Sequence, residues 1–389
     1  MRDFFRIKQK IGAVSAPTLL QIVPSLAYGG LARATLDAAQ AIIAAGGNAI
    51  VASSGGALVP DLLRLRASHL ELPDIANPLW ARLTLPAKLA TSLRDVEVDL
   101  IQARSPTTGW IAAALARRLD RKWIATLHRP GRAPGIAGRL AERRIARTDS
   151  LIAVSDIVSR AARDRFPDLG DRLEVIAPGI NFDRFDPALV RADRVIRLAS
   201  ELRVPDGRLV VLCPATFSED RGQRLLVEAI RLLGREDVFC LLLGSTGIAT
   251  PFEKELEAAI AAAGLQGRMQ IGPYVDDMPA AYMLADVVVS TAGAGQGFSR
   301  ALVEAQAMGR PVVATAGGGA AEAIQPGVTG WLAEPDSASA LADALGNALA
   351  LDTHGRADLA RRGQEEMRRH YNIARSSERL VALYRRLVG

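Results

Sequence analysis

Two glycines follow the first apolar run of the chain and could bring backbone close to an anionic ligand. Gly29 and Gly30 lie between the strand-like run 18–23 and a helix-like stretch that reaches about Ala45. Glycine allows a close approach of the backbone, and a helix N-terminus offers unpaired N–H groups to an anion. Ordinary turn chemistry also explains such a pair. The spacing is neither G-x-G-x-x-G nor a Walker loop, so this turn lacks the fingerprints of nicotinamide-cofactor and P-loop proteins.

A second strand-to-helix turn, within residues 286–315, carries the other candidate binding groups. A strand-like run enters a loop rich in Gly and Ala, and a helix is predicted to begin at about Ser299, which we expect to act as its N-cap. The backbone N–H groups of Gly297, Phe298 and Ser299 would then point into the crevice at the carboxyl edge of a sheet, where ligands of α/β proteins bind. Glu304, one and a half turns into this helix, could bond a diol such as ribose or remain an exposed helix charge.

The composition is that of a globular protein. The chain has 389 residues, a net charge of +6, 49% apolar residues and 23% charged residues, which excludes a disordered chain and a polytopic membrane protein. Two cysteines, Cys213 and Cys240, are too few for a disulfide scaffold or a four-ligand zinc site. The sequence has no zinc-finger spacing and no RNP-type aromatic motif, so nucleic acid is not an expected partner. The basic start lacks the apolar core and cleavage site of a secretory signal, and we expect a cytoplasmic protein.

Both halves of the chain predict alternating strands and helices. The apolar runs that indicate strands are 18–23, 48–52, 100–103, 123–127 and 150–154 in the first half, and 208–213, 238–243, 268–272, 286–290 and 311–315 in the second. These runs are solidly apolar rather than alternating, which is typical of strands covered on both faces and therefore of parallel sheets flanked by helices. The predicted fold is α/β, with two doubly wound Rossmann-like domains that face each other across a cleft.

A turn-rich stretch, residues 177–187, separates the two halves. We predict a first domain over residues 1–190 and a second over 191–365. The Arg-rich end of the chain has helical periodicity, and residues 366–389 are predicted to form a helix that crosses back to the first domain.

The second strand-to-helix turn resembles the signature of the retaining glycosyltransferases of family 4, which have the GT-B fold. That signature has a Glu-Gly/Ala-Phe-Gly start, a second Glu eight residues after the first, and an Ala-x-Ala-x-Gly-x-Pro-Val tail. The second Glu falls on Glu304 and the tail on residues 305–314. Further segments that resemble the family are 150–155, 175–187, 278–286 and 327–332. The resemblance covers nearly the whole chain.

The resemblance implies a role for each candidate residue. Glu304 would bond the ribose of a nucleotide, and the amides of residues 297–299 would hold the donor sugar. Gly29 and Gly30 would approach the diphosphate from the opposite domain. His128 stands at the end of a predicted strand, at a position that in the family often faces the donor sugar. Without the resemblance, a lone histidine at a strand end would be explained as a packed or solvated residue.

The activity that the resemblance implies is transfer of a sugar from a nucleoside diphosphate to a cell-envelope glycan or its lipid carrier, as in polysaccharide or lipopolysaccharide biosynthesis. The first domain would hold the acceptor and the second the nucleotide-sugar. Such enzymes retain the anomeric configuration and need neither a metal nor another cofactor. The leaving phosphate accepts the proton of the acceptor hydroxyl, so the protein contributes positioning and stabilisation of charge.

Three positions depart from the family pattern. Gln296 stands where the first Glu of the signature is expected, Thr216 where an Arg is usual, and Arg221 where a Lys is usual. Arg221 can still bind phosphate, but Thr216 supplies no charge, and losing one such group costs on the order of 3 kcal/mol of transition-state stabilisation. Two functions therefore remain open: an active transferase with Arg221, His128 and Gln296 as its catalytic groups, or a degenerate member that binds nucleotide or glycan and supports a partner enzyme.

An arginine-rich run between His128 and Arg147 contains six Arg and one Glu. Such a run could meet phosphates or an anionic membrane surface, or it could be a solvated helix face. Arg139, Arg143 and Arg144 are the residues predicted to lie on a membrane or acceptor side, with peripheral association at the inner face of the membrane.

Overall fold

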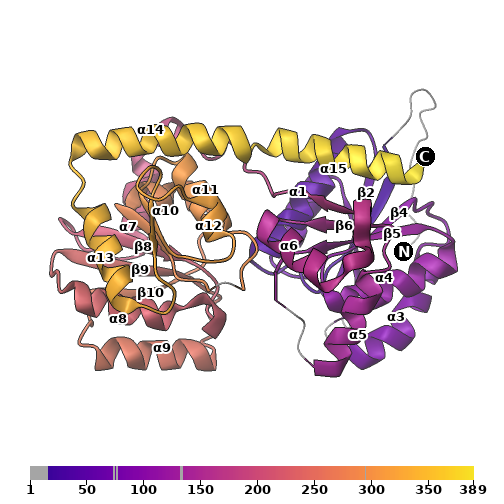
Figure 1. Cartoon of the computed structure of the whole chain (residues 1–389), viewed down its shortest axis with the longest axis horizontal. Helices are drawn as coiled ribbons and strands as arrows, with labels where there is room; N and C mark the ends of the chain where they lie inside the picture. Colours follow the sequence, from indigo (N-terminus) through magenta and orange to yellow (C-terminus); the bar gives the residue numbers. More distant parts are fainter. Residues whose placement is uncertain (1–15, 73–74, 76–77, 132–134, 294) are drawn as a thin grey trace.

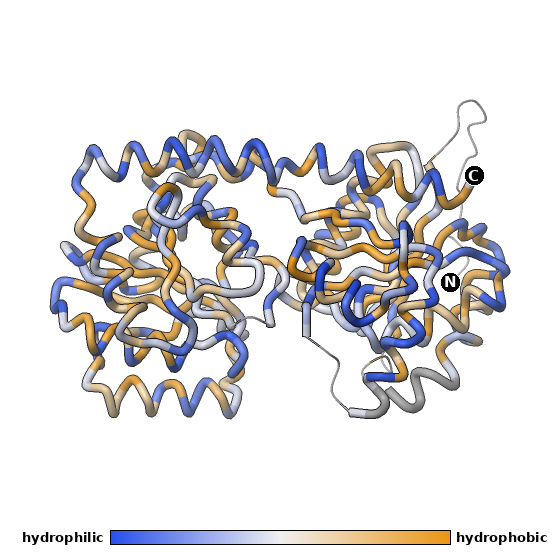
Figure 2. Tube along the Cα trace, in the orientation of Figure 1, coloured by the Kyte–Doolittle hydropathy of each residue, from blue (hydrophilic) through white to orange (hydrophobic). Residues whose placement is uncertain are grey.

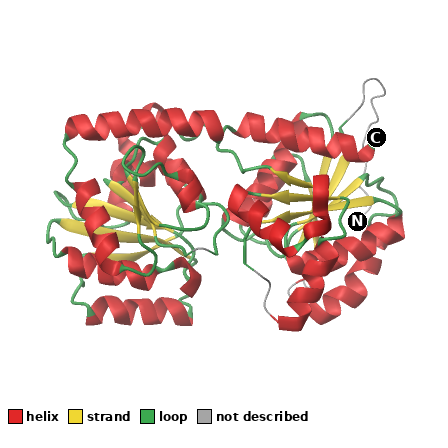
Figure 3. Cartoon of the chain, in the orientation of Figure 1, coloured by secondary structure: helices red, strands yellow, loops and turns green. Residues whose placement is uncertain are grey.

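The computed structural model describes residues 16–72, 75, 78–131, 135–293 and 295–389. It contains two α/β domains side by side, each built on one parallel sheet with helices on its faces (Figures 1 and 3). The predicted fold class is confirmed.

The first domain holds a seven-stranded parallel sheet in the order β3-β2-β1-β4-β5-β6-β7. Its strands are β1 (Thr18–Ile22), β2 (Asn48–Ser53), β3 (Ser68–Glu71), β4 (Leu100–Ala103), β5 (Lys122–Leu127), β6 (Ser150–Ala153) and β7 (Leu173–Val175). Its helices are α1 (Gly30–Ala44), α2 (Val59–Arg64), α3 (Pro78–Ser92), α4 (Pro106–Leu119), α5 (Gly135–Ile145) and α6 (Asp156–Arg165).

The second domain holds a six-stranded parallel sheet in the order β10-β9-β8-β11-β12-β13. Its strands are β8 (Leu209–Pro214), β9 (Val238–Ser245), β10 (Met269–Pro273), β11 (Val287–Ser290), β12 (Val312–Thr315) and β13 (Trp331–Ala333). Its helices are α7 (Ala192–Glu201), α8 (Gln223–Leu233), α9 (Pro251–Ala262), α10 (Met278–Leu284), α11 (Arg300–Ala307), α12 (Ala320–Ala323) and α13 (Ala338–Leu349).

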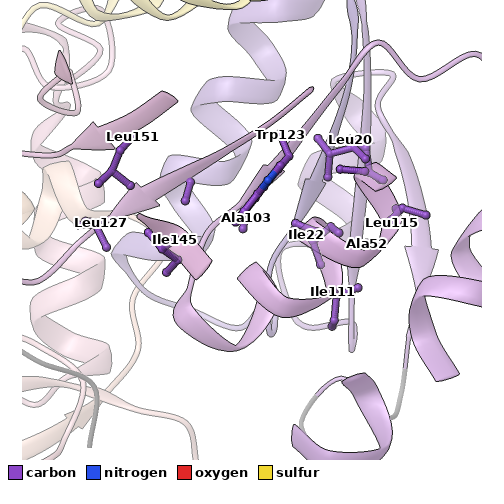
Figure 4. Packing of buried hydrophobic residues seen from close by; sticks show 14 of the residues in the cluster. Leu20, Ile22, Ala52, Ala103, Ile111, Leu115, Trp123, Leu127, Ile145 and Leu151 are labelled. Carbon is purple, nitrogen blue, oxygen red and sulfur yellow. The ribbon is translucent and has the colours of Figure 1, made fainter. Parts of the chain in front are cut away.

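Both faces of each sheet are buried, which accounts for the solidly apolar strands. All four residues of β4, β6 and β12 are buried. In the first domain Leu20 and Trp123 pack with α4 on one face (Figure 4), whereas Leu19 and Ile124 pack with α1 on the other. The hydropathy of the chain follows this arrangement, with apolar strands inside and polar helix surfaces outside (Figure 2).

Three of the four strands at sheet edges were not predicted. They are β3, β7 and β13, with the sequences SHLE, LEV and WLA. Each is short, and each contains polar or only half-buried residues, because an edge strand is covered less than a central one. None of them contains an apolar run longer than three residues.

The chain ends in two helices that connect the domains. Helix α14 (Thr353–His370) packs on α11 of the second domain, and α15 (Ile373–Val388) packs on α1 and β4 of the first. The two run one after the other across the length of the molecule (Figure 1). Tyr384 of α15 is fully buried in the core of the first domain, where its hydroxyl donates to Oε1 of Gln102 at 3.0 Å.

Candidate active site

A cleft of about 990 Å³ lies between the two domains. Its walls are the loops that follow β1, β4 and β5 in the first domain and β8, β9, β10 and β11 in the second. In each sheet the strand order reverses between two of these strands, β1 and β4 in one and β8 and β11 in the other. Ligands of doubly wound sheets bind at such switch points, so the cleft joins the binding edges of both sheets.

Most residues that the sequence singles out line this cleft. They are Gly29, Gly30, His128, Thr216, Arg221, Gln296, Gly297, Phe298, Ser299 and Glu304. Arg139 and Arg143 do not line it; they lie exposed on α5. Arg144, also on α5, stacks its guanidinium over the Trp110 ring at 3.7 Å from the centroid. Of the three arginines of α5, Arg139 and Arg143 can therefore contact an external surface, whereas Arg144 is packed on Trp110.

Glu304 is buried in a small polar network. The Tyr282 hydroxyl donates to its Oε2 at 2.9 Å, and Nη1 of Arg300 lies 3.8 Å from its Oε1. Arg300 also donates to Asp37 of the first domain at 2.7 Å, so the network crosses the cleft. Burial raises the pKa of Glu304 although Arg300 opposes this shift. The carboxylate is thus held by one hydroxyl and one cation, both within reach of a ligand in the cleft.

The loop before α11 is held against the first domain. A Cβ at Gly297 would clash with the carbonyl oxygen of His128 and the side chain of Val158, so only glycine fits there. The N–H of Gly319 donates to the carbonyl of Gln296 at 2.7 Å. Ser299 occupies the N-cap position, but its side chain makes no capping hydrogen bond, contrary to the prediction. The first turn of α11 therefore keeps backbone N–H groups that are available to a ligand.

His128 is a neutral histidine. Burial, with the charges of Arg104 and Arg300 adding to it, lowers its pKa to about 3. Within the described residues its Nε2 is buried without a hydrogen-bond partner. A neutral imidazole that lines the cleft can donate or accept one hydrogen bond to a sugar hydroxyl.

Arg221 faces the cleft from a short 3₁₀ turn, Glu219–Arg221. Burial lowers its pKa, and in the described part of the chain its Nε makes no hydrogen bond and no ion pair includes it. The neighbouring Asp220 does not pair with it; that carboxylate accepts from Arg129 of the first domain at 2.7 Å. Thr216 is exposed at the rim.

Two further contacts bridge the domains around the cleft. Tyr28 and Tyr274 stack with centroids 3.6 Å apart and an interplanar angle of 16°. The carboxylate of Glu322, on α12, accepts from the N–H groups of Asp156 and Ile157 at 3.1 and 2.5 Å. A side chain of one domain thus caps helix α6 of the other, where a negative charge is favoured. Burial raises the pKa of this carboxyl.

Arg104 is the most deeply buried cation of the cleft wall. It follows β4 directly and is 5% exposed. Its Nε and Nη2 both donate to Oε1 of Gln21, at 2.9 and 2.6 Å. Burial lowers its pKa.

Sequence reasoning missed Arg104, Asp37, Tyr282, Arg300 and Glu322. One signal was available for Arg104, because a polar residue directly after a buried strand lies at the ligand-binding edge of a parallel sheet. The other four lie within helices, and only the packing of the domains brings them to the cleft or its rim.

Among the described residues, no group of His, Cys, Asp and Glu is arranged to hold a metal ion. None of the helices in the described ranges is long and apolar enough to cross a membrane.

Two family models match the chain. Residues 28–184 match the model described as Glycosyltransferase Family 4, and residues 197–366 match Glycosyl transferases group 1. A D-inositol 3-phosphate glycosyltransferase of Xylanimonas cellulosilytica is 32% identical over 68% of this chain and 66% of its own. A GDP-mannose-dependent alpha-(1-6)-phosphatidylinositol monomannoside mannosyltransferase of Mycolicibacterium smegmatis is 30% identical over 66% of this chain and 68% of its own.

The first two curated relatives match over 66% and 52% of their own length, so their activities do not transfer by similarity alone. The crystal structure of a glycosyltransferase from Rickettsia africae superposes with a TM-score of 0.84 at 26% identity, over 96% of this chain and 98% of that one. The resemblance first seen in residues 286–315 is confirmed by these matches: the chain belongs to the group 1, family 4 glycosyltransferases of the GT-B fold.

Proposed function

We propose that this protein is a glycosyltransferase that moves a sugar from a nucleoside diphosphate to a glycan or lipid-linked acceptor with retention of configuration. The observation that carries the proposal is the cleft, because it places the binding edges of two parallel sheets opposite each other. One edge can hold a nucleotide-sugar while the other presents an acceptor hydroxyl. Transfer between two bound substrates depends mainly on such positioning.

The charges in the second domain fit a nucleoside diphosphate. Arg221 is a half-buried cation without an ion pair in the described residues, and the first turn of α11 has no side-chain cap on its N–H groups. A second cation of the cleft wall, Arg129 of the first domain, donates to Asp220 beside Arg221. These groups would stabilise the negative charge that develops on the leaving phosphate. Glu304 would hold the ribose.

The names of the relatives support a nucleotide donor of this kind. The mycobacterial relative is named as GDP-mannose-dependent, and others are named D-inositol 3-phosphate glycosyltransferase. The test therefore varies the nucleotide base, the donor sugar and the acceptor. Purified protein is incubated with UDP- and GDP-sugars and candidate glycan and lipid-linked acceptors, and release of nucleoside diphosphate is measured. The anomeric proton of the product, observed by NMR, reports retention or inversion.

A degenerate binder is the second candidate, and Gln296 is the observation that favours it. Gln keeps the size and hydrogen-bonding capacity of Glu but lacks a negative charge beside the developing cationic sugar. In a working enzyme, Gln296→Glu should raise turnover more than it tightens binding. In a degenerate binder, nucleotides bind and turnover stays at zero in both proteins. If Glu lowers an existing activity, Gln296 is an adaptation to another donor sugar.

Peripheral membrane contact is the last part of the proposal. Arg139 and Arg143 are exposed on α5, and Leu140 between them is 44% exposed, a pairing suited to an anionic surface. Each such Arg contributes about 1 kcal/mol near anionic lipid. We expect salt-sensitive binding to anionic vesicles and none to neutral ones, lost in the double variant Arg139→Gln, Arg143→Gln. Arg144 is left intact because it packs on Trp110. Equal sedimentation with both vesicle types at low salt would contradict the contact.

A further inference from the structure

Arg104 is a buried cation without a counter-ion of its own. It is 5% exposed, and its two bonded donors share a single neutral oxygen of Gln21. No ion pair in the described part of the chain includes it. Asp37 is the carboxylate that acts on it, but Asp37 is hydrogen-bonded to Arg300. Burying an unpaired charge is expensive, and buried charges in proteins are normally paired. An anionic ligand in the cleft would supply the partner that Arg104 lacks.

Arg104 lines two connected features of the structure where a ligand could bind. The residue lines the main cleft and also a small recess of about 40 Å³, together with His128, Thr126 and Asp37. The carboxylate of Asp37 is paired with Arg300, which offsets its charge. His128 is neutral, and its buried Nε2 is without a partner in the described residues, so it can donate a second hydrogen bond at the same place. A cation and a neutral donor beside one recess suit an oxyanion.

The donor diphosphate has other partners. Arg221 and the first-turn N–H groups of α11, which Ser299 does not cap, belong to the second domain. Arg104 belongs to the first domain, where its Nε and Nη2 donate to Gln21 of β1. It lines the recess together with residues of α15. Because the second domain already offers groups for the diphosphate, we assign the anionic group at Arg104 to a sugar.

We infer that one of the two sugars that meet in the cleft carries a carboxylate or a phosphate, and that Arg104 binds this group. The inference rests on the proposed function and narrows its substrate class. It also offers a reason for Gln296, since a glutamate there would repel an anionic donor sugar. The two sources are a uronic acid on the donor and a phosphorylated or acidic sugar in the acceptor.

The test compares matched neutral and charged ligands by calorimetry. In the donor arm, UDP-glucuronate and UDP-galacturonate are compared with UDP-glucose and UDP-galactose. In the acceptor arm, glucose 6-phosphate and glucuronate are compared with glucose, in the presence of UDP or GDP. We expect the wild-type protein to prefer the charged member at least about tenfold in one arm, because hydrogen bonds to charged groups are strong in a water-poor site.

Two variants make the comparison specific. Arg104→Gln should abolish the preference and leave affinity for the nucleoside diphosphate unchanged. Arg33→Gln removes a cation from the same cleft that is already 3.8 Å from Asp61, and it should keep the preference. Equal affinity for charged and neutral sugars in both arms would overturn the inference. So would a loss of nucleoside diphosphate affinity in Arg104→Gln, because it would place Arg104 on the diphosphate.

Failure of the proposed function looks different, since then no nucleotide or nucleotide-sugar would bind at all. Inorganic phosphate still reports on Arg104 in that case. It should raise the melting temperature of the wild-type protein and of Arg221→Gln, and raise it less in Arg104→Gln. Identical phosphate responses of the wild type and Arg104→Gln would overturn the inference independently of any transfer.

Discussion

The neutral state of His128 makes the stability of the protein depend on pH in a predictable way. Burial, together with two nearby arginines, lowers the pKa of His128 from 6.5 to about 3. At pH values between about 3 and 6.5, His128 is protonated in the unfolded chain but neutral in the folded protein. The stabilisation from this group is therefore complete above pH 6.5 and decreases as the pH falls. One pKa unit corresponds to about 1.36 kcal/mol, so by pH 5 the loss amounts to roughly 2 kcal/mol.

The assay is urea unfolding of the wild type and His128→Gln at pH 5, 6 and 7.5. Gln keeps a donor and an acceptor but does not titrate. The variant should lose about 2 kcal/mol less than the wild type between pH 7.5 and pH 5. Other groups, including Glu304 and Glu322, titrate in both proteins and cancel in this difference. His354→Gln, at an exposed position, is the matched control and should follow the wild type.

Equal slopes for the wild type and His128→Gln would refute the reasoning, because His128 would then titrate alike in the folded and unfolded chains. A second variant checks the cause. Arg104→Gln removes one of the charges that disfavour the imidazolium, so it should shrink the pH dependence while leaving His128 in place.

Three further changes have expected outcomes. Glu304→Gln should weaken nucleotide binding by about 1–3 kcal/mol in calorimetry, and unchanged affinity would remove Glu304 from the ribose site. Because burial raises the pKa of Glu304, the folded wild-type protein should lose stability as the pH rises above about 4.5, and the variant should lack this loss. Thr216→Arg should raise turnover, and Arg221→Gln should abolish it. Lower turnover in folded Thr216→Arg would show that the site does not need a second cation at position 216. Glu322→Ala removes two hydrogen bonds between the domains and should open the cleft, seen as a larger radius of gyration in X-ray scattering, with Glu322→Asp as the intermediate case; an unchanged radius would show that the other contacts suffice.

The sequence predicts the fold well because the pattern that specifies a parallel sheet is local. A run such as Leu100–Ala103 is buried on both faces, so each residue of the strand must be apolar or paired, and its boundaries can be read directly. The loops that follow central strands then converge on one edge. This geometry explains why residues separated by more than 200 positions, such as Gly29 and Gly297, line one cleft.

The details that escaped prediction depend on contacts between distant elements. Arg300 and Asp37 are 263 positions apart, and nothing in either helix indicates the other. Glu322 has the pattern of an exposed helix charge, and its use as a cap for α6 arises only when the domains close. Ser299 illustrates the reverse case, because its type and position favour a cap that the side chain does not make.

Helix α15 has a consequence for how the protein is made. Val381, Leu383 and Tyr384 fill the face of the first sheet that α1 also covers, yet β7, the last strand of that sheet, is complete at Val175. About 200 residues must still be translated before α15 can dock, which takes roughly 10 to 40 s at bacterial and eukaryotic synthesis rates. During that interval the nascent first domain exposes an apolar groove on the ribosome. We expect a holding chaperone to bind this groove until α15 docks.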